Sequence, residues 1–297
     1  MTNQTTDLFA ALRYNVNLGT PAYRVADSGP KAIRLADNVG KVAWRSDTGE
    51  AIGLVGTAQT IVQPSVTISV FERLLESGHI TDRNLKAFAW KNGAKQAIVA
   101  ETGKTNVVRD GHGKLQEIIQ RVFSYDSFDG SASWRFGSAD YVFICTNGMV
   151  NITGGNNVRL RHTASIHDRF AAAVQALRAE FDSFEQQIPM LQKLADTRLN
   201  DRGFQAILDE WFPKDENGER SSRAQNQVEH VERLYHEGAG ADPGSLWGAY
   251  QAATNWITHH RGRDGSREEQ NLVGAGANLN RTILTDLVAR AEQAAAL

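Results

Sequence analysis

Cysteine is almost absent from this chain of 297 residues, which holds only Cys145. A single cysteine excludes an intrachain disulfide framework and is typical of proteins in a reducing cytoplasm. The sequence also lacks an apolar run near the roughly 20 residues that cross a bilayer. Its N-terminus, MTNQTTDLFAALRYN, has no basic region followed by an apolar stretch, so no signal peptide is expected. We therefore expect a cytoplasmic protein that does not associate with a membrane.

A strong excess of one charge is missing as well, because the formal net charge is only -2. Any basic surface must therefore be local and balanced by acidic residues elsewhere. The chain is 41% hydrophobic and 22% charged, which is usual for a folded domain and indicates that it can bury a substantial core without disulfides.

The motifs of several enzyme classes are absent. Gly103-Lys104-Thr105 resembles the end of a phosphate-binding loop, but Ile98 stands where that loop needs a glycine. The segment after it, NVVRDG, indicates strand and turn, so we expect a hairpin turn at 103–105. No G-x-S-x-G nucleophile elbow occurs. Gly274 and Gly276 lack the third glycine and the preceding strand of a dinucleotide site. We expect no cofactor and no catalytic set.

The first half of the chain carries strand signals. Residues 41–56 contain two apolar segments around the polar turn 46–49, which predicts a hairpin. Residues 65–80 change to helical spacing, with Gly78 as a stop. A strand pair is expected in 94–111, and the stretch 131–163 is the most strand-like.

From Ser165 the pattern becomes helical. Ser165 and Asp168 resemble a capping box. Apolar residues then recur at three- and four-residue steps, at Phe170, Val174, Leu177, Phe181 and Phe184. Further helices are expected near 204–212, 222–237, 245–260 and 278–295. Without regular β-α-β alternation the chain is predicted to be α+β, with an N-terminal antiparallel β-rich half that includes a helix and a mostly helical C-terminal half. The expected domains are 1–164 and 165–297.

Basic and aromatic residues cluster in three places, and these clusters are the candidate nucleic-acid contacts. In VRLRHT, alternation along a strand turns the two arginines away from Val158 and Leu160. Arginine, histidine and aromatic side chains that lie close together are suited to phosphate contact and base stacking. The candidates are Trp134, Arg135, Arg159, Arg161, His162, His259, His260, Arg261, Arg263 and Arg267. Solvated, salt-bridged surface arginines remain the plain alternative for each cluster.

The histidines do not form a compact metal motif such as H-E-x-x-H. His259 and His260 are adjacent, so on one helix they diverge by about 100°. A metal site assembled from distant segments remains an alternative, with ligands drawn from His162, His167, His259, His260 and Asp264. We rank phosphate contact above metal near His259, because a cation would be repelled by Arg261 and Arg263.

Several segments together resemble a known family. They are WRSDTGEAIGLVG, FDGSASWRFG with TNGMVN, VRLRHTASIHDRF, and LWGAYQAATNWITHHRGR with GAGANLN. These segments look like the phage- and plasmid-associated proteins catalogued as domain of unknown function 932. The resemblance implies mobile genetic elements and a bacterial host cell. The strand-hairpin-then-helix beginning is also similar, by fold-level analogy, to single-strand annealing proteins.

We therefore expect a non-catalytic protein that binds single-stranded DNA and promotes strand annealing in phage or plasmid recombination, as a homo-oligomer. In this hypothesis the arginines contact phosphates and Trp134 is the stacking platform. Two alternatives stay open. One is a metal-dependent, nuclease-like enzyme. The other is a phage structural or interaction protein whose apolar helix face, through Phe170, Val174 and Leu177, packs against another chain.

Overall fold

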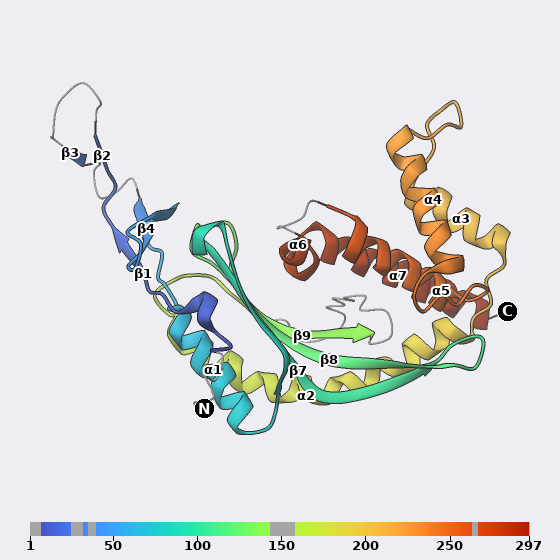
Figure 1. The fold of residues 1–297 in the computed structure, drawn as a ribbon, viewed down its shortest axis with the longest axis horizontal. Helices are drawn as coiled ribbons and strands as arrows, with labels where there is room; N and C mark the ends of the chain where they lie inside the picture. The colour runs from blue at the N-terminus through green and yellow to red at the C-terminus, as the bar shows by residue number, and fades with distance from the viewer. Residues whose placement is uncertain (1–6, 25–31, 35–39, 143–157, 263–266, 297) are drawn as a thin grey trace, which may run out of the picture. The chain divides into compact units, whose positions relative to one another are not determined.

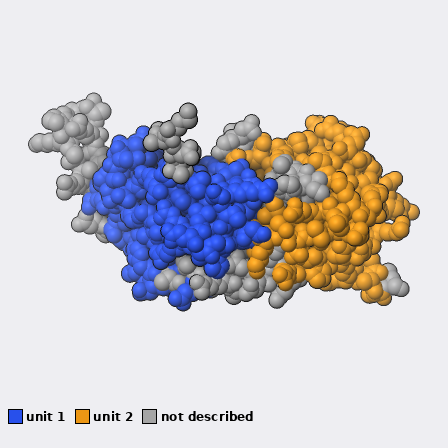
Figure 2. Space-filling model, turned by 60° about the horizontal axis from the view of Figure 1, so that its bottom comes forward, with its two compact units in different colours: residues 1–103, 121–138, 155–181 blue, residues 104–120, 139–154, 182–297 orange. Residues whose placement is uncertain are grey.

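The chain divides into two compact units, each built from three segments (Figure 2). The computed structural model describes residues 7–24, 32–34, 40–142, 158–262 and 267–296. Unit 1 comprises residues 1–103, 121–138 and 155–181, and unit 2 comprises residues 104–120, 139–154 and 182–297. The boundary expected between 164 and 165 lies inside the last segment of unit 1.

The strands that the structure describes form three sheets (Figure 1). A three-stranded sheet has the order β1-β4-β5, with β1 Val16–Gly19, β4 Lys41–Arg45 and β5 Ala51–Val55. The strands β2 (Ala22–Arg24) and β3 (Ala32–Arg34) pair with each other. A five-stranded sheet has the order β10-β9-β8-β7-β6, with β6 Thr81–Trp90, β7 Lys95–Arg109, β8 Leu115–Ser127, β9 Trp134–Val142 and β10 Val158–Leu160.

Helix α1 (Pro64–Glu76) illustrates how sequence sets a local boundary in unit 1. Pro64 occupies the first turn, where its missing N–H costs nothing. The preceding Gln63 does not cap the helix, because its side chain exchanges hydrogen bonds of 3.0 and 2.8 Å with the backbone of Val16 on β1. Gly78 follows the helix with a φ of +71°, a conformation that favours glycine. Gln63 therefore ties the start of α1 to the three-stranded sheet.

The core of unit 1 lies on one face of the five-stranded sheet. Side chains of β9 and β10 contribute Trp134, Phe136 and Leu160, and β7 contributes Ile98 and Ala100. They pack in one buried cluster with residues of α1, β1 and the first turn of the long helix α2 (Ile166–Asp196). Since side chains alternate along strands, the residues between them belong to the opposite face.

Unit 2 is mainly helical, with α3 Asp201–Trp211, α4 Ser222–Glu237, α5 Leu246–Asn255, α6 Arg267–Val273 and α7 Ala275–Ala295. A π-helical turn, Trp256–His260, continues α5. Its core gathers the buried faces of these helices around Trp247 and Tyr250, and Val108 of β7 and Ile118 of β8 complete it. Among the helices that the structure describes, none combines the length and apolar character needed to span a bilayer.

The α+β class is confirmed, as are the hairpin around 46–49, the helix ending before Gly78 and the four expected C-terminal helices. The strand pair expected within 94–111 is wrong. Residues 95–109 form one continuous strand, β7, and Gly103 lies inside it with a φ of +77°. The chain turns later, where Asp110 N–H donates to Lys114 O and Gly113 N–H to Asp110 O. A glycine can adopt a positive φ inside a strand, so it was a poor marker of the turn.

Candidate nucleic-acid interface

Two of the expected arginines are direct neighbours in unit 1. Arg159 on β10 is the register partner of Arg135 on β9. The pairs on either side of them, Trp134 with Leu160 and Phe136 with Val158, contribute to the core. Arg135 and Arg159 therefore lie on the opposite sheet face, which we call the arginine face. Directly opposed residues on antiparallel strands have Cβ atoms about 5 Å apart.

Exposure supports this placement. Arg159 is exposed and Arg135 is partly buried. Arg161 follows β10 and is exposed as well. Its carbonyl oxygen accepts a 2.9 Å hydrogen bond from Nη2 of Arg169, which also bonds Thr163 Oγ1 at 2.7 Å. Within the described residues, the side chains of Arg159 and Arg161 have no ion-pair partner.

The arginine face also contains a charge that is already neutralised. Arg121 on β8 precedes the core residue Val122, so it belongs to the arginine face. Its Nη2 lies 2.8 Å from Oε1 of the buried Glu101, which also accepts a 3.0 Å bond from Asn84. Arg121 is therefore a structural residue of this face, and Arg159 is the one that remains exposed.

Trp134 is not a stacking platform, and this prediction is wrong. Its side chain is fully buried, and its ring centroid lies 4.6 Å from that of Phe170 and 5.6 Å from that of Phe136. A nucleobase needs an exposed ring face. The sequence pattern Trp134-Arg135 placed the two side chains together, but strand alternation sends them to opposite faces of the sheet.

His162 is also a structural residue and not a phosphate contact. It is 7% exposed, its Nδ1 lies 3.1 Å from Thr60 O, and its Nε2 lies 2.9 Å from Oδ1 of Asp126. Burial favours the neutral ring, but the hydrogen bond and charge of Asp126 outweigh it and raise the pKa of His162. Burial raises the pKa of Asp126, which is fully enclosed. The pair joins the end of β10 to β8 inside unit 1.

The second expected segment, 259–267, lies in unit 2. Trp256 and Ile257 are buried, as expected, and Gly262 has a φ of +91°, which lets the chain leave the helix. His259 and Arg261 are partly exposed and His260 is exposed. Arg267 opens α6 and is partly exposed. Arg263 lies outside the described residues.

The π-helical turn brings His260 against a histidine from α4 that the sequence did not link to it. The rings of His230 and His260 have centroids 4.2 Å apart. Burial lowers the pKa of both, and neighbouring positive charges add to this effect, chiefly Arg233 for His230 and His230 for His260. Sequence spacing could not reveal this pair, because its members are 30 positions apart. The π-helical turn also changes the direction in which the side chains of 256–260 point, compared with a continued α-helix.

The two alternative functions receive no support from these positions. Within the described residues, no three histidine, cysteine, aspartate or glutamate side chains form a group that could hold a metal ion. Asp264 lies outside the described residues. Phe170, offered as part of a partner-binding face, is buried against Trp134. The side chains of Val174 and Leu177 are not described.

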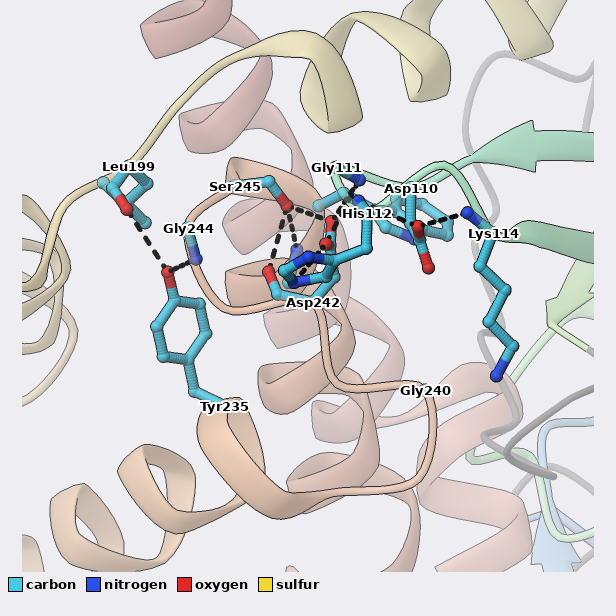
Figure 3. Close-up of polar contacts among 12 residues, drawn as sticks. Asp110, Gly111, His112, Lys114, Leu199, Tyr235, Gly240, Asp242, Gly244 and Ser245 are labelled. Atoms are coloured by element: carbon cyan, nitrogen blue, oxygen red, sulfur yellow. Dashed lines mark hydrogen bonds and ion pairs between the residues drawn. The ribbon is translucent and has the colours of Figure 1, made fainter.

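A polar network in unit 2 is the strongest feature that the sequence did not indicate (Figure 3). The buried carboxylate of Asp242 accepts two 3.1 Å bonds from the N–H of Gly111 and a bond from Ser245 Oγ. Ser245 also caps α5 by accepting a 2.9 Å bond from Gly248 N–H. His112 Nε2 lies 3.6 Å from Asp242, but that ring is 63% exposed.

This network holds the β7–β8 turn to the loop before α5. Within the turn, Asp110 accepts bonds from the N–H groups of His112 and Lys114. Gln116 Nε2 donates to Asp110 Oδ2, and Gln116 Oε1 accepts from Trp247 and Gln251. Ser245 Oγ faces Asp242 and the helix N-terminus, so it is a cap and not a nucleophile. The network is structural.

Comparison with known proteins gives a family and no activity. No curated protein and no solved structure matches the chain. A family model described as a domain of unknown function (DUF932) matches residues 51–284. This match takes in every strand of the five-stranded sheet and all of the helices from α1 to α6. The chain therefore belongs to this family, DUF932.

Proposed function

We propose that this protein binds single-stranded DNA through the arginine face of its five-stranded sheet and promotes annealing of complementary strands. The observation that carries the proposal is the cross-strand pair of Arg135 and Arg159. Like charges directly opposite one another destabilise a sheet, so their cost is offset when a polyanion lies over them. The exposed Arg161 extends the same charge past the end of β10.

We infer a preference for a single strand over a duplex from the regular spacing of side chains along a strand. Side chains two residues apart on a strand are separated by about 6.6 Å, which is close to the spacing of phosphates in an extended strand. In this mechanism arginines neutralise the phosphates and leave the bases able to pair. No nucleotide hydrolysis takes part.

Annealing as a homo-oligomer is part of the proposal. Strand β6 is the last strand of the sheet order β10-β9-β8-β7-β6. An edge strand of 10 residues offers backbone N–H and C=O groups to another chain. The proposed setting is the cytoplasm of a bacterial host and the recombination of phage or plasmid DNA.

The test is a titration of a labelled single-stranded oligonucleotide at several salt concentrations. Binding should weaken steeply as salt rises, because each neutralised phosphate releases a counterion. Arg159→Ala should lower the affinity and flatten the dependence on salt by roughly one phosphate contact.

Arg73→Ala is the matched control, since Arg73 is an exposed arginine of the same unit on helix α1. It should bind like the wild type. Salt-independent binding, absence of binding, or equal losses in both variants would each show that the arginine face is not the site.

A further inference from the structure

Two aromatic side chains lie beside each other on β6 and belong to neither apolar core. The rings of Phe88 and Trp90 are stacked, with centroids 5.2 Å apart and planes 5° from parallel. Both are partly exposed. Their strand neighbours Ala87 and Ala89 pack on the core of unit 1, and Phe88 and Trp90 are absent from both buried clusters. Phe88 and Trp90 therefore present part of their ring surface outside both cores.

The register places this aromatic pair on the arginine face. Ala87 is the partner of Ile98, and both face the core with Trp134 and Leu160. Phe88, opposite Ala97, and Trp90, opposite Lys95, therefore lie on the other face. Tyr125 of β8 supports this assignment, because its ring centroid lies 6.5 Å from that of Trp90.

Lysines flank the aromatic pair. Lys86 is exposed and precedes Phe88 by two residues, so it projects from the same face. Lys91 is exposed and follows Trp90 directly. Lys95 is the cross-strand neighbour of Trp90. An apolar ring pair bordered by cations is complementary to a ligand that has flat, uncharged rings on an anionic backbone.

We propose that Phe88 and Trp90 form the stacking platform for unpaired bases of the bound strand. The proposal rests on the proposed function and assigns to this pair the role first expected of Trp134. Every base has a π-face, so such a platform binds single strands with little regard to sequence. In a duplex the faces of internal bases are already stacked, so the platform also selects for single strands. Lys86 and Lys91 would contact the phosphates beside the stacked bases.

The experiment compares an oligothymidylate with an abasic oligonucleotide of the same length and charge. Wild-type protein should bind the strand with bases about tenfold more tightly. The double variant Phe88→Leu, Trp90→Leu should bind both strands alike, with the salt dependence of the wild type retained. Trp44→Leu is the matched control, because Trp44 is a partly buried tryptophan of the same unit on β4. It should keep the preference.

The outcomes separate the two proposals. Salt-dependent binding without any preference for the strand with bases overturns the platform and leaves the arginine face in place. Absence of binding to either strand overturns the proposed function itself. A double variant that keeps the preference but changes the oligomeric mass in light scattering shows that the pair contacts another protein chain, which also overturns the platform.

Trp90→Phe provides a second measurement should the double variant fail to fold. Stacking of a base on Trp90 should quench its emission. The quenching by oligothymidylate should therefore be smaller in Trp90→Phe than in the wild type, and unchanged in Trp44→Phe. Equal quenching in wild type and Trp90→Phe would contradict the platform.

Discussion

Arg159 lies directly opposite Arg135 on the face of the sheet that turns away from the core of unit 1. Like charges directly opposite one another on paired strands destabilise a sheet. The arrangement is understandable if the face binds a polyanion.

Arg159→Thr should therefore stabilise the free protein while weakening its binding of single-stranded DNA. Threonine suits a strand and removes the repulsion, so the free energy of unfolding should rise by about 0.5 kcal/mol. Urea unfolding at low salt measures this change, and the oligonucleotide titration measures the loss of affinity. A loss of stability in the free protein would show that Arg159 has a structural role.

Trp134→Ala should unfold or severely destabilise the protein. The fully buried ring packs against Phe136 and Phe170, so its removal should cost about 3–5 kcal/mol through lost burial and a cavity. Trp134→Phe should cost less and leave the affinity for oligothymidylate unchanged. A specific loss of base-dependent binding in a stable Trp134→Phe protein would restore this residue as a stacking platform.

Arg159, Arg161 and Trp134 show which features of the candidate site can be predicted from the sequence. Alternation predicted that Arg159 and Arg161 point away from Val158 and Leu160, because a single strand sets that pattern. The partner of Arg159 could not be predicted, since register depends on how β9 and β10 are aligned across the intervening chain. For Trp134 the local pairing with Arg135 was misleading, because neighbours on a strand lie on opposite faces.

The missed aromatic pair has a different cause. The segment KAFAWK alternates, and small alanines at 87 and 89 mark the side that faces the core, so the signal was present in the sequence. The Asp242 network had no such signal. Asp242 and Gly111 are 131 positions apart, and only the tertiary fold brings the carboxylate to the N–H group.

The ion pair of His162 and Asp126 should make stability depend on pH. The pKa of His162 is raised above its ordinary 6.5, so its stabilising effect is complete below that pH and is lost as the pH rises through the folded-state pKa. The raised pKa of Asp126 acts in the same direction. His162→Gln should cost about 3 kcal/mol below pH 6.5 and less at alkaline pH.

Chemical unfolding of the wild type and His162→Gln over a range of pH measures this difference. His167→Gln is a suitable control, because His167 is an exposed histidine in the next helix. A cost that stays constant with pH would indicate that His162 contributes packing and no charge.

Asp242→Ala should loosen the β7–β8 turn and destabilise unit 2. Its removal leaves the N–H of Gly111 and Oγ of Ser245 without their acceptor, at a cost of about 2–4 kcal/mol. Amide hydrogen exchange of Gly111 and Gly248 should accelerate. Asp215→Ala, in an exposed loop of the same unit, is the control.

Gly248→Ala tests the same network from the other side. A methyl group there would lie 2.0 Å from the carbonyl oxygen of Asp242, so the loop must move. The free energy of unfolding should fall by at least the amount expected for Asp242→Ala. Thermal unfolding measures the loss. A variant as stable as the wild type would show that the loop before α5 is free to shift.

The interleaving of the two units governs how this protein can be dissected. The chain passes from one unit to the other five times, so no single cut releases either of them. A fragment ending at residue 164 would retain Val108 and Ile118 but lose the helices that bury them, and would expose that apolar surface to aggregation. Limited proteolysis should therefore yield nicked molecules that stay associated, and studies of either half require the intact polypeptide.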